Sequence, residues 1–168
     1  MEVFEAVRSV RAVRAYQGKS VPPDVVRRIV EAGRLSASSM NGQPWRFIVV
    51  ENRDTLRRLG EVARSGPYIA QAPLAVVVAI EKTKFAVSDA SRAIQSMVLT
   101  AWSDGVGSNW VGFLGFGEVK ALLGIPDTVD VLAIVPFGYP ARPVGKGKKQ
   151  RKPLSEVAHR ERFSQPFA

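Results

Sequence analysis

Apolar residues recur at helical spacing in several stretches of the chain. In the longest of these, alanines and larger apolar residues form one broad stripe on a helical face, and Gly105 follows where the stripe ends. Pro23 and Asp24 open another stretch, as expected at a helix N-terminus. The spacing predicts helices over residues 1–10, 22–35, 54–65, 88–104 and 117–126.

Three other stretches are short, apolar and rich in valine and isoleucine, which indicates strands over residues 46–51, 72–81 and 129–139. The run at 72–81 is continuously apolar, so we expect a strand covered on both faces. Strands and helices interleave without a repeat, which favours a layered α/β or α+β architecture. No linker divides the chain, and we expect one domain over residues 1–168.

Composition excludes several kinds of chemistry. The sequence has no cysteine, so it offers no disulfide, thiolate nucleophile or thiolate metal site. The single histidine, His159, cannot form a histidine cluster, and a Ser-His-Asp triad would rest on that one imidazole. No apolar run approaches the ~20 residues that cross a bilayer, and the first ten residues do not resemble a signal peptide. We expect a cytoplasmic protein without a membrane partner.

The net charge of +9 is concentrated in one segment, RPVGKGKKQRK at residues 142–152. This segment holds six bases and no acid, which leaves 18 bases and 15 acids elsewhere. Such a local charge suits one phosphate group or a solvated tail better than a long nucleic-acid duplex, and we expect no nucleic-acid partner. The alternative is a basic module that binds RNA or another polyanion, although few aromatic residues accompany the bases.

A second group of bases lies near the N-terminus, where Arg8, Arg11 and Arg14 are three residues apart. On a helical stretch the three side chains would share a face. One interpretation is a solvated basic face. The other is a guanidinium clamp on a phosphate, which the segment at 142–152 would complete.

The loop after the second predicted helix carries Ser38, Ser39, Asn41 and Gln43. These side chains donate and accept hydrogen bonds but do not ionise, which suits a ligand whose own atoms react. The alternative is a helix end capped by its own serine and asparagine side chains. The glycine-rich stretch 105–117 lacks the GxGxxG order of a dinucleotide fold, and GKGKK lacks a phosphate-loop frame.

Six segments occur together and in order: RAVRAY, SASSMNGQPWRFIVV, DASRAIQSMVLTAW, GVGSNWVGF, LGIPDTVDVLAIVPFGYP and RKPLSEV. This ordered set resembles the nitroreductase family of FMN-dependent oxidoreductases over nearly the whole chain. The resemblance implies an α+β layered fold, with a mostly antiparallel sheet flanked by helices. It also implies an intertwined homodimer whose two FMN sites lie at the interface and draw on both subunits.

The resemblance assigns roles to individual positions. Arg11, Ala12 and Arg14 match the family's Arg-Ser-x-Arg segment, which grips the FMN phosphate and ring edge. Ser38, Ser39 and Asn41, with Gln43 in the same signature, match the segment that reaches the flavin from the partner subunit. Gly112 falls where a backbone amide approaches the reactive flavin nitrogen, and Lys149 and Arg151 fall where the chain returns to the phosphate.

Three positions depart from the family pattern: Ala12 and Ala37 replace the usual serine and proline, and Ser96 replaces a common asparagine. Losing one neutral hydrogen bond costs about 0.5–1.5 kcal/mol, so we expect FMN binding to weaken at most about tenfold per site. Because the loop at 38–43 must reach another subunit, the first helix and the helix at 88–104 are candidates for the dimer interface. The alternative for the helix at 88–104 is a buried core helix.

The implied activity is hydride transfer from NAD(P)H through FMN to a small acceptor such as a nitroaromatic or quinone, in ping-pong order. The flavin carries the chemistry, so no side chain is expected to be catalytic. The alternative within the fold is another flavin reaction: reductive dehalogenation, dehydrogenation of a peptide-derived ring, or cleavage of the flavin.

Overall fold

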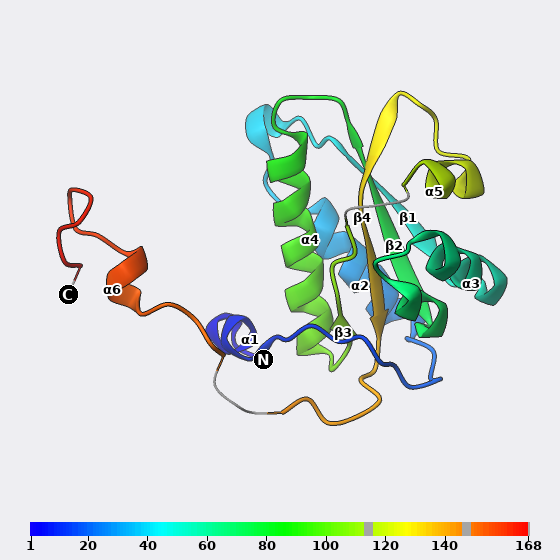
Figure 1. Ribbon diagram of the computed structural model, residues 1–168, viewed down its shortest axis with the longest axis horizontal. Helices are drawn as coiled ribbons and strands as arrows, with labels where there is room; N and C mark the ends of the chain where they lie inside the picture. The colour runs from blue at the N-terminus through cyan, green and yellow to red at the C-terminus, as the bar shows by residue number, and fades with distance from the viewer. Residues whose placement is uncertain (113–115, 146–148, 168) are drawn as a thin grey trace.

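A computed structural model describes residues 1–112, 116–145 and 149–167. Its centre is a four-stranded antiparallel sheet in the order β1-β2-β4-β3 (Figure 1). The strands are β1 (Trp45–Val50), β2 (Leu74–Glu81), β3 (Gly107–Ser108) and β4 (Val129–Gly138). The three longer strands confirm the predicted ones to within a residue or two, and the α+β fold with an antiparallel sheet is also confirmed.

Strand β2 is buried on both faces, as its continuous apolar run predicts. Leu74, Val76, Val78 and Ile80 contribute to the core on one side of the sheet, while Ala75 and Val77 contribute to the core on the other. The pairing of β2 with β4 shifts its register between Val78 and Ala79. Beyond this bulge the strands continue, so β4 spans the full length of β2.

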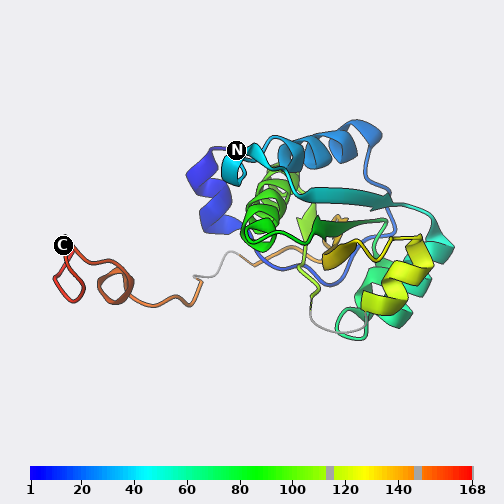
Figure 2. The same cartoon turned by 90° about the horizontal axis from the view of Figure 1, so that it is seen from above.

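Helices cover both faces of the sheet, in the layers visible in Figures 1 and 2. One core contains residues of α2 (Pro23–Arg34) and α4 (Ala86–Ser103). The other contains residues of α3 (Arg53–Val62), the 3₁₀ helix η2 (Pro67–Gln71) and α5 (Phe116–Leu123). The predicted helices are therefore all present, and the positive φ angles of Gly105 and Gly124 mark the ends of α4 and α5.

The alanine stripe of α4 faces the core of its own chain. Ala90, Ala93 and Ala101 are fully buried there, and α2 approaches so closely that a side chain at Gly33 would meet Met97. The core-helix interpretation is thus right for this face, and any interface on α4 must use its outer face. The other candidate, α1 (Val3–Ser9), exposes Val3, Phe4 and Val7.

Beyond Arg151 the chain leaves the layers and runs outward as an arm, residues 154–167, which both views show (Figures 1 and 2). The arm begins with the short helix α6 (Leu154–Val157). Its apolar side chains are uncovered: Leu154 is 63% and Phe163 is 86% exposed. Within the arm, the ring of His159 lies 4.6 Å from that of Phe163, so the single histidine of the sequence packs on an aromatic ring of the same arm.

The described residues contain neither a membrane-spanning helix nor a cluster of metal-binding side chains. Across residues 1–112, 116–145 and 149–167, no helix is both long and apolar enough to cross a membrane. Within the same ranges, no group of three histidine, cysteine or acidic side chains is arranged to hold a metal ion.

Candidate functional site

A pocket of about 860 Å³ lies where three distant segments of the chain meet one side of α4. We call it the cationic pocket. The segments are residues 10–12, 108–110 and 149–151, and α4 contributes Ile94, Gln95 and Val98.

Backbone pairing fixes the first two segments. Ala12 forms a parallel bridge with Ser108, and the amide of Val13 donates a 2.8 Å hydrogen bond to the Ser108 carbonyl. The side chain of Val13 occupies the space that a Cβ at Gly107 would need, so glycine is required for this close approach. The N-terminal segment therefore acts as an extra edge strand beside β3, and it brings Arg11 to the pocket.

The third segment returns from the far end of the chain. The ammonium of Lys149 donates a 2.8 Å hydrogen bond to the carbonyl of Val7, near the C-terminus of α1. This contact joins residues 142 positions apart and places Lys149 beside Arg11 and Arg151. Three bases thus line one pocket.

The cationic pocket is suited to an anion. None of its described lining residues is acidic. Burial, followed by repulsion from Arg151 and Arg11, lowers the pKa of Lys149 below that of an ordinary lysine. A bound anion would relieve this repulsion, so the pocket favours a phosphate or a similar group.

A buried acid on α4, Asp89, anchors the loop at 38–43. Asp89 on α4 is 2% exposed and accepts hydrogen bonds of 3.1 Å from both the amide and the hydroxyl of Ser39. The same carboxylate pairs with Arg92. The Ser39 side chain therefore bonds within its own chain, to α4 and not to the end of α2 that the helix-end interpretation names.

The rest of this loop holds an unusual backbone. Met40, Asn41 and Gln43 have φ angles of 51°, 55° and 47°, in the left-handed region that non-glycine residues seldom adopt. The amide of Gln43 donates to the Ser38 hydroxyl at 3.0 Å, and the Gln43 side chain donates to the Asn41 side chain at 3.2 Å. These bonds hold a strained turn whose outer residues, from Met40 to Gln43, are exposed.

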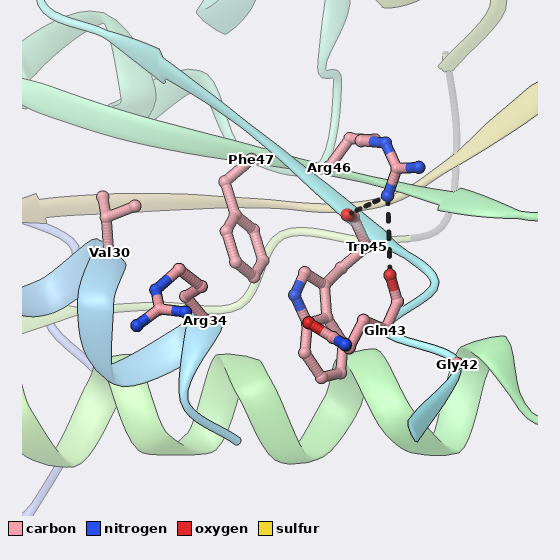
Figure 3. A pocket seen from close by; sticks show the side chains of 7 residues that line it. All are labelled: Val30, Arg34, Gly42, Gln43, Trp45, Arg46 and Phe47. Carbon is pink, nitrogen blue, oxygen red and sulfur yellow. Dashed lines mark hydrogen bonds between the residues drawn. The ribbon is translucent and has the colours of Figure 1, made fainter. Parts of the chain in front are cut away.

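A second pocket, of about 500 Å³, lies beside this loop and is shown in Figure 3. Its two arginines are already paired: Arg34 with Glu31 at 2.6 Å, and Arg46 with Glu81 at 2.6 Å. Arg46 also donates to the carbonyls of Trp45 and Gln43, the two dashed lines in the figure. These contacts fix the exit of the loop into β1, and they leave the second pocket without an uncompensated charge.

The predicted site residues therefore fall into separate groups within one chain. Arg11, Ala12, Lys149 and Arg151 line the cationic pocket together. Ser38, Ser39, Asn41, Gln43 and Gly112 do not line it, and Gly112 is buried behind it, beside Trp110.

Arg14 is also absent from the lining. The shared helical face of Arg8, Arg11 and Arg14 is wrong, because α1 ends at Ser9 and only Arg8 is helical. On the extended backbone that follows, side chains three residues apart point to opposite sides.

Five polar or aromatic lining residues were not among the predicted site residues: Gln95, Ser108, Asn109, Trp110 and Gln150. Gln95 is an exposed residue of α4, beside its buried stripe, and Asn109 and Trp110 lie within a glycine-rich stretch where no periodic pattern marks them. The signal that the sequence offered was a tryptophan between glycines.

Known proteins share sequence with this chain along most of its length. The profile of the nitroreductase family matches residues 7–83 and 64–139. A Methanothermobacter thermautotrophicus protein named NADH dehydrogenase/NAD(P)H nitroreductase is 35% identical over 154 residues, covering 86% of this chain and 81% of its own. The FMN reductase [NAD(P)H] of Bacillus subtilis is 26% identical over 187 residues, covering 96% of this chain and 74% of its own.

A solved structure shows the same fold. The crystal structure of an NADH dehydrogenase/NAD(P)H nitroreductase from Bacteroides thetaiotaomicron superposes with a TM-score of 0.87. It is 24% identical and covers 96% of this chain and 98% of its own. Profile, relatives and fold agree, and the chain belongs to the nitroreductase family.

Proposed function

We propose that the protein is an FMN-dependent oxidoreductase that takes hydride from NAD(P)H and delivers it to a small acceptor such as a nitroaromatic or a quinone. The observation that carries this proposal is the cationic pocket, in which three bases gather and none of the described lining residues is acidic. It offers no histidine, carboxylate or thiol among those residues for acid-base or nucleophilic chemistry. Such a pocket suits a bound cofactor that supplies the reaction.

The donor set of the pocket fits FMN. Arg11, Lys149 and Arg151 provide guanidinium and ammonium donors for a phosphate dianion, and burial, followed by the charges of Arg151 and Arg11, lowers the pKa of Lys149. Ile94 and Val98 provide an apolar wall beside them. When bound, FMN supplies the hydride acceptor and donor for the two half-reactions of a ping-pong cycle.

The chain's own residues bind and orient the cofactor. Arg11, Lys149 and Arg151 hold the phosphate end, with Ala12 at the position where the family has a serine. The backbone of Gly112 lies next to the pocket residue Trp110, and its amide is proposed to stabilise negative charge on the reduced ring. Arg14, on the opposite side of the extended segment, remains assigned to the ring edge as a prediction.

The site is proposed to be complete only in a homodimer. The strained loop with Ser38, Ser39, Asn41 and Gln43 does not line the cationic pocket of its own chain, so it reaches a flavin only if the flavin belongs to a second copy. The surfaces to bury are present: α1 exposes Phe4 at 69%, and the arm exposes Leu154 and Phe163. An arm that crosses to the other subunit would give the intertwined dimer that the resemblance implies.

The test is the visible spectrum of the purified protein before and after NAD(P)H is added under argon. We expect a flavin spectrum that bleaches with NAD(P)H and recovers when a nitroaromatic or quinone is added. Recovery only with a halogenated aromatic would replace the acceptor class while keeping the cofactor. Bleaching of the oxidised flavin by a cyclic peptide-derived substrate, in place of NAD(P)H, would make that substrate the hydride donor and would also keep the cofactor. A colourless protein that does not bind added FMN, but binds RNA in a salt-sensitive way, would overturn the proposal.

A further inference from the structure

Trp110 lies on a backbone that is held on both sides. Before it, Ser108 pairs with Phe137 of β4, and after it Val111 exchanges two backbone hydrogen bonds of 2.9 and 2.8 Å with Ile134. Val111 is buried, and its side chain fills the space that a Cβ at Gly66 would need. The stretch therefore has little freedom, and Trp110 is presented from a rigid support.

The side chain of Trp110 lies at the wall of the cationic pocket and remains 40% exposed, which is uncommon for an indole that the fold could have buried. Its indole nitrogen lies 2.6 Å from where a Cβ at Gly112 would stand. A side chain at 112 would therefore displace the indole from this position.

A buried polar pair positions this stretch. Asn109 is 8% exposed and donates its amide hydrogens to the hydroxyl of Tyr68 and, at 3.0 Å, to the carbonyl of Trp110. Tyr68 comes from η2 and packs against the core that contains residues of α3 and α5. Both amide hydrogens of Asn109 are thus used, so the pair locks the peptide that carries the indole.

We propose that the indole of Trp110 is the surface on which the isoalloxazine ring of FMN packs, and that Tyr68 and Asn109 are positioning residues that act through it. This inference rests on the proposed function. A ligand with an anionic phosphate and a planar ring matches a pocket with three bases and one exposed indole. Neither the family's phosphate-gripping segment nor the loop at 38–43 contains Trp110.

The experiment is FMN titration of the dimeric protein, with two readouts: the dissociation constant and the fluorescence of the bound flavin. An electron-rich indole in contact with a flavin quenches its emission by electron transfer, whereas phenylalanine and leucine do not. We expect wild-type protein to quench FMN strongly. Trp110→Phe should keep affinity within about twofold but brighten the bound flavin, and Trp110→Leu should brighten it and bind about two- to tenfold more weakly.

Trp102→Phe is the matched control, because the Trp102 indole donates to the Ser9 hydroxyl and does not line the pocket. It should change neither readout. Tyr68→Phe keeps the ring and removes the acceptor for Asn109, so partial brightening with unchanged melting temperature would show positioning rather than folding.

Each negative outcome has its own meaning. If wild type does not bind FMN, the proposed function fails. If wild type binds FMN but Trp110→Leu binds and quenches equally well, the role of Trp110 is overturned while the proposed function stands. If Trp110→Leu brightens but Tyr68→Phe and Asn109→Ala do not, the positioning pair is overturned.

Discussion

The hydroxyl of Ser39 donates a 3.1 Å hydrogen bond to Asp89, a carboxylate that is only 2% exposed. The hydroxyl therefore points into its own subunit, and the loop presents its outer residues instead. Since Asp89 also accepts from the Ser39 amide, a single buried acid fixes where the strained turn from Met40 to Gln43 begins. Ser39 therefore helps to shape the loop, and its hydroxyl oxygen keeps its lone pairs as acceptors.

Replacing Asp89 should therefore weaken FMN binding although Asp89 does not line the cationic pocket. Asp89→Ala leaves the Ser39 amide and hydroxyl without their acceptor, and we expect a loss of about 1–3 kcal/mol in the free energy of unfolding together with weaker FMN binding. Asp89→Asn keeps one acceptor oxygen and should retain part of both. Urea unfolding and flavin titration measure the two effects.

The control for Asp89 is Asp130→Ala, since Asp130 is an exposed acid that pairs with Lys82 at 3.7 Å. This pair should contribute little to stability. Unchanged flavin affinity in a folded Asp89→Ala protein would contradict the role of the loop in the cofactor site.

Arg11→Ala should lower FMN affinity on the order of 10- to 100-fold, the value of a charge-assisted hydrogen bond to phosphate. Its dimer and its melting temperature should be unchanged, because Arg11 is partly exposed and not in the core. Arg58→Ala, an exposed arginine on α3, removes the same charge away from the pocket and serves as the control. Equal flavin retention by the Arg11 and Arg58 variants after gel filtration would exclude Arg11 from the phosphate site.

Flavin affinity should fall at alkaline pH because of Lys149. An ordinary lysine has a pKa of 10.5, and burial with Arg151 and Arg11 lowers that of Lys149 in the folded protein. The ammonium therefore loses its proton at a lower pH than usual, and the phosphate loses a partner. Titrations with FMN between neutral pH and about pH 10 measure this, and Lys149→Arg should flatten the decline.

The pH dependence that Lys149 gives to stability runs in the opposite direction to that of flavin affinity. Between the lowered pKa and 10.5, the folded protein without FMN binds fewer protons than the unfolded chain. Its free energy of unfolding therefore gains a contribution from Lys149 as the pH rises through this window, and that contribution is absent below it.

A decline of flavin affinity that is equally steep in Lys149→Arg would assign the effect to another group.

Two variants with weakened flavin binding should restore one another if the site is shared between subunits. Arg11→Ala damages the phosphate half, and Asn41→Ala damages the loop half. When the two are unfolded and refolded together, mixed dimers contain one site with both halves intact. We expect tight flavin binding to return in up to about one site in four, because statistical mixing makes half of the dimers heterodimers.

The same mixture distinguishes the shared site from a site within one subunit. Refolding either variant alone should restore nothing. If the mixture binds no more flavin than the separate variants, then Arg11 and Asn41 of one subunit serve the same site, and the loop does not serve a second subunit.

The sequence predicted the sheet and its covering helices well, because the signals for them are local. The apolar run of β2 and the stripe of α4 carry their periodicity within a few turns or pleats. The sequence did not predict β3, because a strand of two residues, Gly107 and Ser108, is too short to show an alternation of apolar and polar positions. The pairing of Ala12 with Ser108 depends on residues almost a hundred positions apart, which no local pattern records.

The site was predicted unevenly for the same reason. Arg11, Lys149 and Arg151 were found through charge and resemblance, and the structure brings them together. Trp110 and Asn109 were not found, since a tryptophan and an asparagine in a glycine-rich stretch gain meaning only from the pocket they line. Asp89 was read as part of a motif, and its burial beneath Ser39 appears only when the loop folds over α4.

The uncovered arm sets a condition on when the protein can work. A single copy holds a complete sheet and the cationic pocket, but among the described residues its arm leaves Leu154 63% and Phe163 86% exposed. Under the proposed dimer, cofactor loading becomes a second-order process that depends on two copies meeting. Dilution would then release the flavin before it unfolds the sheet, and the amount of working enzyme in a cell would rise with the square of its abundance when copies are scarce.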